Sequence, residues 1–296
     1  MLKYALPVAL LSLSCTAASL VDGVRSASEQ NDYARAAGYI QSYESRGGQT
    51  PESILALSWM ARTALEQKKY VQADRYAQDT YQRALKEMKK GPLDREPYLP
   101  LALGASIEVQ AQVLAVKGQR TEAISMLEDQ LKKYSSTSIH ARIQKNINLL
   151  SLKGKPAPPL QALSLPKGKP ALLFFWAHWC SDCRAEIPIL AQLKKEYGPK
   201  GMVFIGPTQK YGYIGADENI PPRVELPYIE KIRAEYYSAV VDGPAAVSEQ
   251  NFLNYGVSTT PTLTLVDRRG IVRLYHPGGM TYRELRSAIE DVLRTP

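Results

Sequence analysis

The chain has 296 residues, of which 45% are hydrophobic and 22% are charged. This length is sufficient for two domains with separate cores, and the composition is typical of a folded protein, which excludes wholesale disorder. The formal net charge is +8, but the Lys and Arg residues are scattered in short pairs. Nucleic-acid binding usually needs a concentrated basic patch. The charge therefore indicates solvated helix surfaces and predicts no nucleic-acid partner.

Residues 1–20 have the pattern of an export signal. A basic residue precedes an apolar run at 5–14, which is too short to cross a membrane, and small residues follow it. We expect cleavage after about residue 18 and a mature protein outside the cytoplasm, as in a bacterial periplasm. The alternative is a lipid anchor at Cys15, although Ser12 stands where lipoprotein signals usually carry Leu. Only this anchor, or an electron-donor partner, would bring the protein to a membrane.

Residues 26–153 are expected to form an all-α domain. Thr50 followed by Pro51 is a typical helix start, with a capping hydroxyl and a proline in the first turn. Apolar residues then recur every three or four positions through two pairs of helices. The turns within the two pairs, at 68–73 and 118–123, have related sequences that each end on Ala. The region therefore predicts a repeat built from helical pairs.

This helical pattern resembles the tetratricopeptide repeat, in which small residues let two antiparallel helices pack closely. The match is degenerate, because the full consensus is absent and residues 91–100 form a long insertion between the pairs. Roughly two to three such units are near the minimum for a stable stack. The resemblance implies that the domain recruits a protein partner. The alternative is a plain helical bundle without a binding role.

The composition changes at residues 153–159, where prolines exclude a continuing helix. We place a domain boundary here and expect a second domain over 154–296. The unbroken apolar run at 171–176 predicts a buried strand. A helix is expected to begin directly after it, at Cys180 or Ser181.

Cys180 and Cys183 lie two residues apart at the start of this expected helix. There the unpaired backbone N–H groups and the helix dipole favour an anion, so the Cys180 thiolate is stabilised as a nucleophile. Cys183 lies one turn along and attacks the resulting mixed disulfide, which releases the partner. The pair predicts a redox-active disulfide and thiol–disulfide exchange, with no other cofactor.

Other uses of the cysteine pair are less favoured. A structural disulfide that closes so short a loop contributes only about 2 kcal/mol. A zinc site needs four ligands, whereas the chain beyond residue 20 offers this pair and three scattered histidines. Covalent haem attachment needs His directly after the second Cys, and Arg184 stands there. We therefore expect no bound metal.

Residues 155–293 resemble the TlpA/ResA branch of the thioredoxin superfamily. The matching segments are 154–158 at the start of the domain, 175–188 around the cysteines, 259–262 before a strand, 267–270 at a hairpin and 278–279 before the last helix. The resemblance implies a thioredoxin fold, an α/β domain with a central mixed sheet flanked by helices. It also implies exchange with protein thiols and disulfides, more often as a reductase, without identifying the partner or the electron donor.

The resemblance assigns further residues to the site. It implies a cis peptide bond between Thr260 and Pro261 beside the dithiol, in a loop that pairs with the extended chain of the substrate. Glu186 stands where this branch carries a carboxylate, and we expect it to accept the proton of Cys183. The alternative for Glu186 is a surface residue in a salt bridge. Trp179 is expected to shape the surface that a partner meets.

The fold implied by the resemblance accounts for most of the remaining chain. We expect strands at 202–206, 238–242, 262–266 and 271–276, and helices at 228–237, 247–255 and 282–293. Residues 207–226 are longer than the fold needs, and they either border the active site and select partners or form a disordered excursion. His178 is expected to be exposed in its loop.

Three functions are therefore compared. The first is an exported thiol–disulfide oxidoreductase, which is favoured by the cysteine pair with Pro261 expected opposite it. The second is a protein-interaction module that uses the helical domain, with the thioredoxin fold as a scaffold. The third is a thiol peroxidase, which is disfavoured because the TxxC pattern usual in peroxiredoxins is absent.

Overall fold

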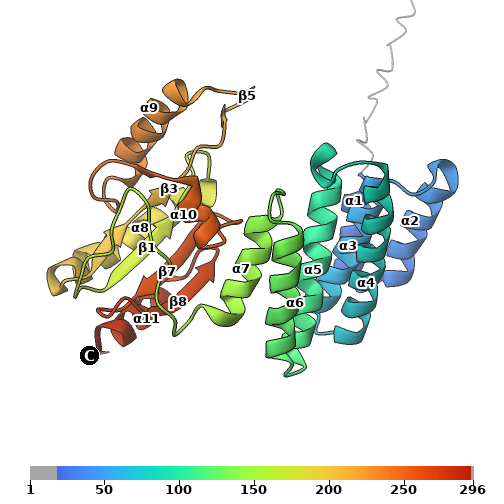
Figure 1. Cartoon of the computed structure of the whole chain (residues 1–296), viewed down its shortest axis with the longest axis horizontal. Helices are drawn as coiled ribbons and strands as arrows, with labels where there is room; N and C mark the ends of the chain where they lie inside the picture. Colours follow the sequence, from blue (N-terminus) through green and yellow to red (C-terminus); the bar gives the residue numbers. More distant parts are fainter. Residues whose placement is uncertain (1–18, 295–296) are drawn as a thin grey trace, which may run out of the picture.

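The structure is a computed structural model that describes residues 19–294. The expected export signal and Cys15 lie outside the described residues. Figure 1 shows two parts side by side, a layer of helices and an α/β part that contains the sheet. The last helix of the layer is the one that lies against the α/β part (Figure 1).

The first part consists of helices that each pack against the next along the chain. They are α1 (Leu20–Glu29), α2 (Tyr33–Gly47), α3 (Pro51–Glu66), α4 (Tyr70–Glu87), α5 (Tyr98–Val116), α6 (Arg120–Lys133) and α7 (His140–Ser151). The predicted start of α3 is confirmed, because the Thr50 side chain accepts a hydrogen bond from Ser53 N and Pro51 opens the helix. The helices begin at Leu20, earlier than the expected residue 26.

Alanine is the most frequent apolar residue in the core of the helical part. Its buried alanines are Ala27, Ala36, Ala56, Ala61, Ala64, Ala73, Ala77, Ala84, Ala102, Ala105, Ala111 and Ala123. Small side chains at a helix contact let the two axes approach closely. Within residues 19–294, α5 alone has the length and hydropathy of a membrane span, and most of that stretch is buried among the other helices. The arrangement fits a helical-pair architecture, and its assignment to the tetratricopeptide repeat stays a prediction.

The segment between the two helix pairs is shorter than expected. Two single turns, η1 (Met88–Lys90) and η2 (Leu93–Arg95), connect α4 to α5, and α5 already begins at Tyr98. Leu93 is buried and packs into the core between the helices. The connection is therefore a packed link, and part of the expected insertion at 91–100 belongs to a helix.

The second part is built on a four-stranded mixed sheet in the order β2-β1-β7-β8. Its strands are β1 (Ala171–Phe175), β2 (Val203–Ile205), β7 (Thr262–Val266) and β8 (Val272–Pro277). β1 runs parallel to β2 and antiparallel to β7, and β7 and β8 form a hairpin. The expected strand at 171–176 and the expected hairpin are confirmed within one or two residues.

Helices cover both faces of this sheet. On one face, Leu172 and Phe174 of β1 pack with residues of α8 (Ser181–Tyr197) and α11 (Tyr282–Arg294). On the other, Leu173 and Phe175 pack with Phe252 of α10 (Glu249–Asn254) and with Leu152 at the end of α7. Because both faces are covered, β1 is apolar at every position instead of alternating. This central sheet flanked by helices is the expected thioredoxin fold.

The strand expected at 238–242 is wrong. These residues form a turn after α9 (Pro222–Ile232) and the π-helical turn η4 (Arg233–Tyr237), and Val240 and Val241 are buried against the core. The short strand in this region is instead β6 (Ala246–Val247), which pairs with β3 (Pro207–Thr208). The apolar run at 238–242 reflects burial, and burial alone does not distinguish a strand from a packed turn.

Candidate active site

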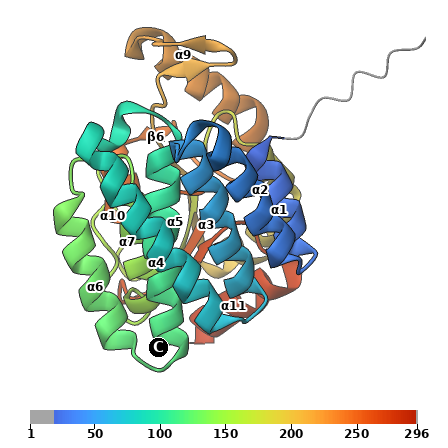
Figure 2. The same cartoon turned by 90° about the vertical axis from the view of Figure 1, so that its right-hand side faces the viewer.

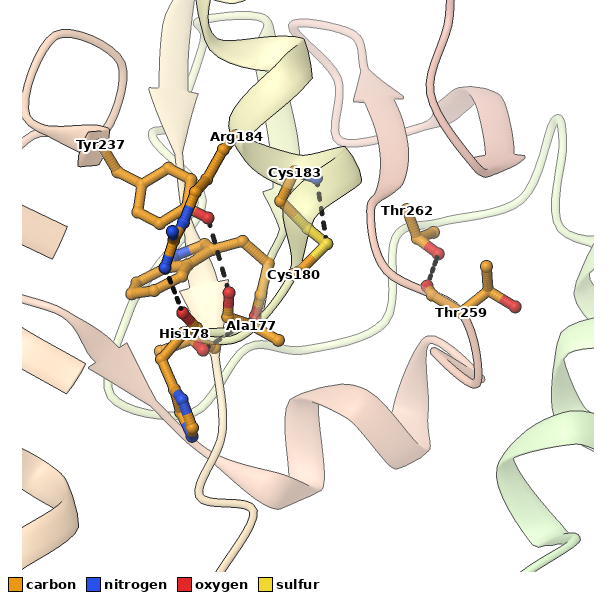
Figure 3. The surroundings of a disulfide bond; sticks show 10 residues. Ala177, His178, Cys180, Cys183, Arg184, Tyr237, Thr259 and Thr262 are labelled. Atoms are coloured by element: carbon orange, nitrogen blue, oxygen red, sulfur yellow. Dashed lines mark hydrogen bonds between the residues drawn. A yellow bond between two sulfur atoms is a disulfide. The ribbon is translucent and has the colours of Figure 1, made fainter. Parts of the chain in front are cut away.

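The two cysteines lie where β1 leads into α8. Cys180 is the residue that caps the N-terminus of α8, and its Sγ accepts a hydrogen bond of 3.0 Å from Cys183 N. The two sulfur atoms form a disulfide (Figure 3). After reduction, the same backbone N–H and the helix dipole favour the thiolate form of Cys180. This geometry can support nucleophilic attack by Cys180 on a disulfide.

Hydrogen bonds fix the turn that precedes Cys180. Trp176 Nε1 donates to the carbonyl of Gly206 at 3.0 Å, and the Trp176 ring lies 4.4 Å from the ring of Tyr237. Arg184, from the first turn of α8, donates to the carbonyl of His178 at 3.1 Å (Figure 3). The backbone around the disulfide is thus held from the sheet on one side and from the helix on the other.

His178 is buried, so the expectation of an exposed loop histidine is wrong. Its side chain is 1% exposed, and three tyrosine rings surround it with centroids 5.4 to 5.7 Å away: Tyr211, Tyr213 and Tyr228. Its Nε2 lies 3.4 Å from Oε1 of Glu225 without forming a hydrogen bond. Burial lowers the pKa of His178, and the nearby Glu225 carboxylate only partly opposes this effect. The residues that cover His178 come from the long insertion at 207–226 and, for Tyr228, from α9.

This insertion borders the cysteine-bearing turn. It contains the small hairpin β4 (Tyr213–Ile214) and β5 (Asp217–Glu218), and together with α9 it projects beyond one end of the sheet (Figures 1 and 2). Trp179, which is 47% exposed, packs with Tyr211 and Tyr213 at centroid distances of 5.4 and 6.4 Å. The description of 207–226 as a disordered excursion is therefore wrong, and its position beside the site favours the other interpretation.

Glu225 anchors the insertion and was not singled out in the sequence. Its carboxylate is 1% exposed and accepts hydrogen bonds from the backbone N–H groups of Tyr211 and Gly212. The only signal in the sequence is an acidic residue near the end of an aromatic-rich insertion. That signal does not reveal which backbone groups the carboxylate binds, because they lie in the loop before β4, whereas Glu225 lies on α9.

The loop before β7 lies opposite the disulfide. The peptide bond between Thr260 and Pro261 is cis, as the family resemblance implied. Thr262 is paired with Phe175 across the antiparallel ladder, so the start of β7 lies at the edge of the sheet where β1 ends. Thr259 and Thr262, which share a hydrogen bond of 2.6 Å, face the disulfide on the side away from Arg184 (Figure 3). The predicted substrate loop and the dithiol therefore lie together.

Glu186 is buried on α8, one turn after Cys183. Its side chain accepts a hydrogen bond of 3.0 Å from Met280 N, and a Cβ at Gly279 would collide with its carboxylate. It has no ion pair among residues 19–294, so the alternative of a surface salt bridge is wrong. Burial raises the pKa of Glu186, although the Met280 hydrogen bond partly offsets this. A buried carboxyl group with a raised pKa, one turn along the helix from the second cysteine, is of the kind that exchanges protons in general acid–base catalysis.

Comparison with known proteins identifies the second part of the chain. The model of the AhpC/TSA family matches residues 144–210. The thioredoxin-like protein YneN of Bacillus subtilis is 27% identical over 146 residues, which are 49% of this chain and 75% of that protein. A crystal structure of a putative thiol:disulfide interchange protein DsbE from Chlorobium tepidum covers 48% of this chain and 95% of its own, with 24% identity and a TM-score of 0.36.

The thiol:disulfide interchange protein DsbE of Escherichia coli K12 is 30% identical over 154 residues, which are 48% of this chain and 74% of that protein. The similarity lies in the C-terminal half, which carries the disulfide. Through this half, the chain belongs to the thioredoxin-like family of thiol:disulfide interchange proteins that includes DsbE.

Proposed function

We propose that the protein is an extracytoplasmic thiol–disulfide oxidoreductase of the TlpA/ResA type, which reduces disulfides in protein partners. One observation carries this proposal: Cys180 caps the N-terminus of α8, is bonded to Cys183, and lies across from the loop that contains Pro261. A scaffold would not need this arrangement. The proposed direction of the reaction, reduction of the partner's disulfide, is taken from the family resemblance.

The reaction starts from the reduced pair. The Cys180 thiolate attacks one sulfur of the partner's disulfide, which forms a mixed disulfide and releases the partner's other sulfur as a thiolate that takes up a proton. Cys183 then loses its proton to Glu186 and attacks Cys180 Sγ. The second partner sulfur leaves as a thiol, and Cys180 and Cys183 are left as a disulfide. Two electrons have moved to the partner, and an external dithiol restores the reduced pair.

The partner chain docks against the loop around Pro261, where Thr260 presents its backbone to an extended segment. Trp179, on the other side of the disulfide and half exposed, forms part of the same contact surface. The helical part, which we assign to a tetratricopeptide-like repeat, recruits the partner. This division places the chemistry in one half of the chain and the choice of partner in both.

The test is the equilibrium reduction potential of the Cys180–Cys183 pair in the mature chain, titrated against glutathione or dithiothreitol. Dithiol proteins of this kind span about −270 to −120 mV, and we expect a value near the reducing end. A value near the oxidising end would contradict the reductase direction and make the protein a disulfide donor. A pair without reversible exchange would contradict the enzyme function altogether.

A further inference from the structure

A pocket of about 410 Å³ lies between the two parts of the chain, next to the loop that leads to Pro261. The helical part contributes the charged side chains Arg62 from α3, Glu108 from α5, and Arg142 and Lys145 from α7. The second part contributes Ser258 and Thr259. The pocket thus joins the helical part to the stretch of backbone opposite the disulfide.

The two walls of this pocket are held at a fixed separation. Gly256 has a positive φ of 59°, and a Cβ there would collide with the backbone of Gln144 and Lys145 in α7. Only glycine lets the loop approach α7 this closely. From the sheet, the Tyr275 hydroxyl donates to the carbonyl of Gly256 at 3.2 Å. The helical part is therefore packed directly on the loop and is not a tethered neighbour.

The pocket carries an excess of positive charge. The single carboxylate, Glu108, is already used, because it binds Arg142 at 2.7 Å and Lys145 at 2.9 Å. Arg62 has no carboxylate partner among the described residues, and its guanidinium lies 4.0 Å from the ring centroid of Trp59. Arg62 is half-buried, and burial followed by the nearby Arg142 lowers its pKa, whereas the carboxylates of Glu108 and Glu66 partly oppose this. A partly desolvated, unpaired arginine gains free energy from an incoming carboxylate.

We propose that this pocket binds an acidic side chain of the disulfide-bearing partner, with Arg62 as the residue that pairs with its carboxylate. The inference rests on the proposed function, since it requires the partner chain to lie along the loop before Pro261. Thr259 is two residues from Pro261, and an extended chain advances about 3.3 Å per residue. The acidic residue should therefore stand roughly two to four residues from the reacting cysteine. The helical part thereby selects disulfides whose cysteine has an acidic residue nearby in the sequence.

The experiment uses the mature chain and pairs of peptide disulfides. The two peptides of a pair differ only in carrying Glu or Gln three residues from the cysteine, and separate pairs place this residue before and after the cysteine. The rate constant for reduction by the reduced protein is measured for each peptide. We expect the Glu peptide to react about tenfold faster, as for a partly buried charge pair. Arg62→Gln should bring the ratio close to one, and Arg62→Lys should keep part of the preference.

Arg25→Gln is the matched control. Arg25 lies over the same Trp59 ring, at 4.5 Å, but it pairs with Glu29 and does not line the pocket. This variant loses the same charge and the same kind of ring contact, and it should keep the tenfold preference. A preference that falls equally in both variants would overturn the assignment to Arg62.

A salt series on the unaltered protein gives a test that does not depend on the folding of any variant. The preference for the Glu peptide should decrease toward one as the ionic strength rises, because salt screens the charge pair. Equal rates for the two peptides at low salt would overturn the inference while leaving the proposed function intact, provided that both peptides are reduced. If neither peptide is reduced, the proposed function fails, and this inference fails with it.

Discussion

The two parts of the chain place their ionisable side chains in opposite ways. Within residues 19–294, the helical part fully buries no carboxylate, Lys, Arg or His, whereas the second part buries His178, Glu186, Glu225 and Asp267. Asp267 serves the hairpin, because it binds Arg273 and two backbone N–H groups there. The other three lie around the segment that carries the cysteines.

This difference in burial indicates which residues of each part are relevant to function. Burying an ionisable group costs folding free energy, so such groups persist mainly where the chemistry or a specific contact requires them. In the second part, Glu225 holds the covering insertion, and the proposed function assigns Glu186 a role in proton transfer at the sulfurs. In the helical part the core is apolar and rich in alanine, and the charged side chains line the pocket beside Thr259. Under the two proposals, fully buried ionisable groups serve the chemistry in the second part, and half-buried ones serve recognition in the helical part.

The largest effect is expected when the cysteines are replaced, which tests whether the chemistry takes place in the second part. Cys180→Ser should abolish reduction of a protein disulfide, because the proposed nucleophile at the N-cap of α8 is lost. Cys183→Ser should still attack the partner but should accumulate the mixed disulfide, visible by non-reducing electrophoresis. Substantial reduction of the protein disulfide by Cys180→Ser would show that the reaction does not take place at this cysteine pair.

Glu186→Gln tests whether a buried acid acts on the sulfurs. Release of the mixed disulfide should slow by about tenfold to a hundredfold at neutral pH, because the proton acceptor for Cys183 is lost. Since burial raises the pKa of Glu186, the base form accumulates only above its ordinary range, and the wild-type release rate should rise with pH there. Stopped-flow measurements across pH should show this rise in the wild type and its absence in the variant. Superimposable profiles would assign Glu186 a purely structural role.

Glu225→Ala tests the anchor of the insertion. The change leaves the N–H groups of Tyr211 and Gly212 without their acceptor, which should lower the free energy of unfolding by about 2 to 3 kcal/mol. Glu249→Ala is the matched control, because its surface ion pair with Lys210 should contribute less than about 1 kcal/mol. Denaturant unfolding of the two variants measures both values. Equal losses would mean that the buried carboxylate is no more important than a surface one.

The smallest expected effect concerns Glu108 in the helical part. Burial would raise its pKa, but Arg142 and Lys145 hold it below the ordinary value. The folded chain then binds fewer protons than the unfolded chain, so this stabilisation is present above about pH 4.3 and is lost as the pH falls through the folded pKa. Glu108→Gln should cost about 1 to 2 kcal/mol at neutral pH and progressively less in acid. Thermal unfolding of Glu108→Gln across pH measures this loss of stability, and Glu128→Gln, at an exposed position, is the control. A loss of stability that does not depend on pH would contradict the ion-pair explanation.

Several features of the fold could be predicted because they depend on neighbours in the chain. Thr50 and Pro51 specify a helix start through a capping hydroxyl and a preset φ, and both act within one turn. The apolar run at 171–176 indicates a strand covered on both faces, since its length is that of a strand. Cys180 at the start of α8 follows from the strand that ends just before it. The reactive cysteine pair and its position at a helix N-terminus are therefore properties of the local sequence.

Only the tertiary structure decided what surrounds this chemistry. His178 is buried because residues from a later insertion close over it, and Glu225 matters because it binds backbone groups at the other end of that insertion. Val240 and Val241 are apolar because they fill the core from a turn, so their pattern resembles that of a strand. Arg62 and Thr259 line the same pocket only because α7 packs on the loop at Gly256. Local patterns carry secondary structure and the reactive motif, whereas burial and charge pairing arise from contacts between residues far apart in the chain.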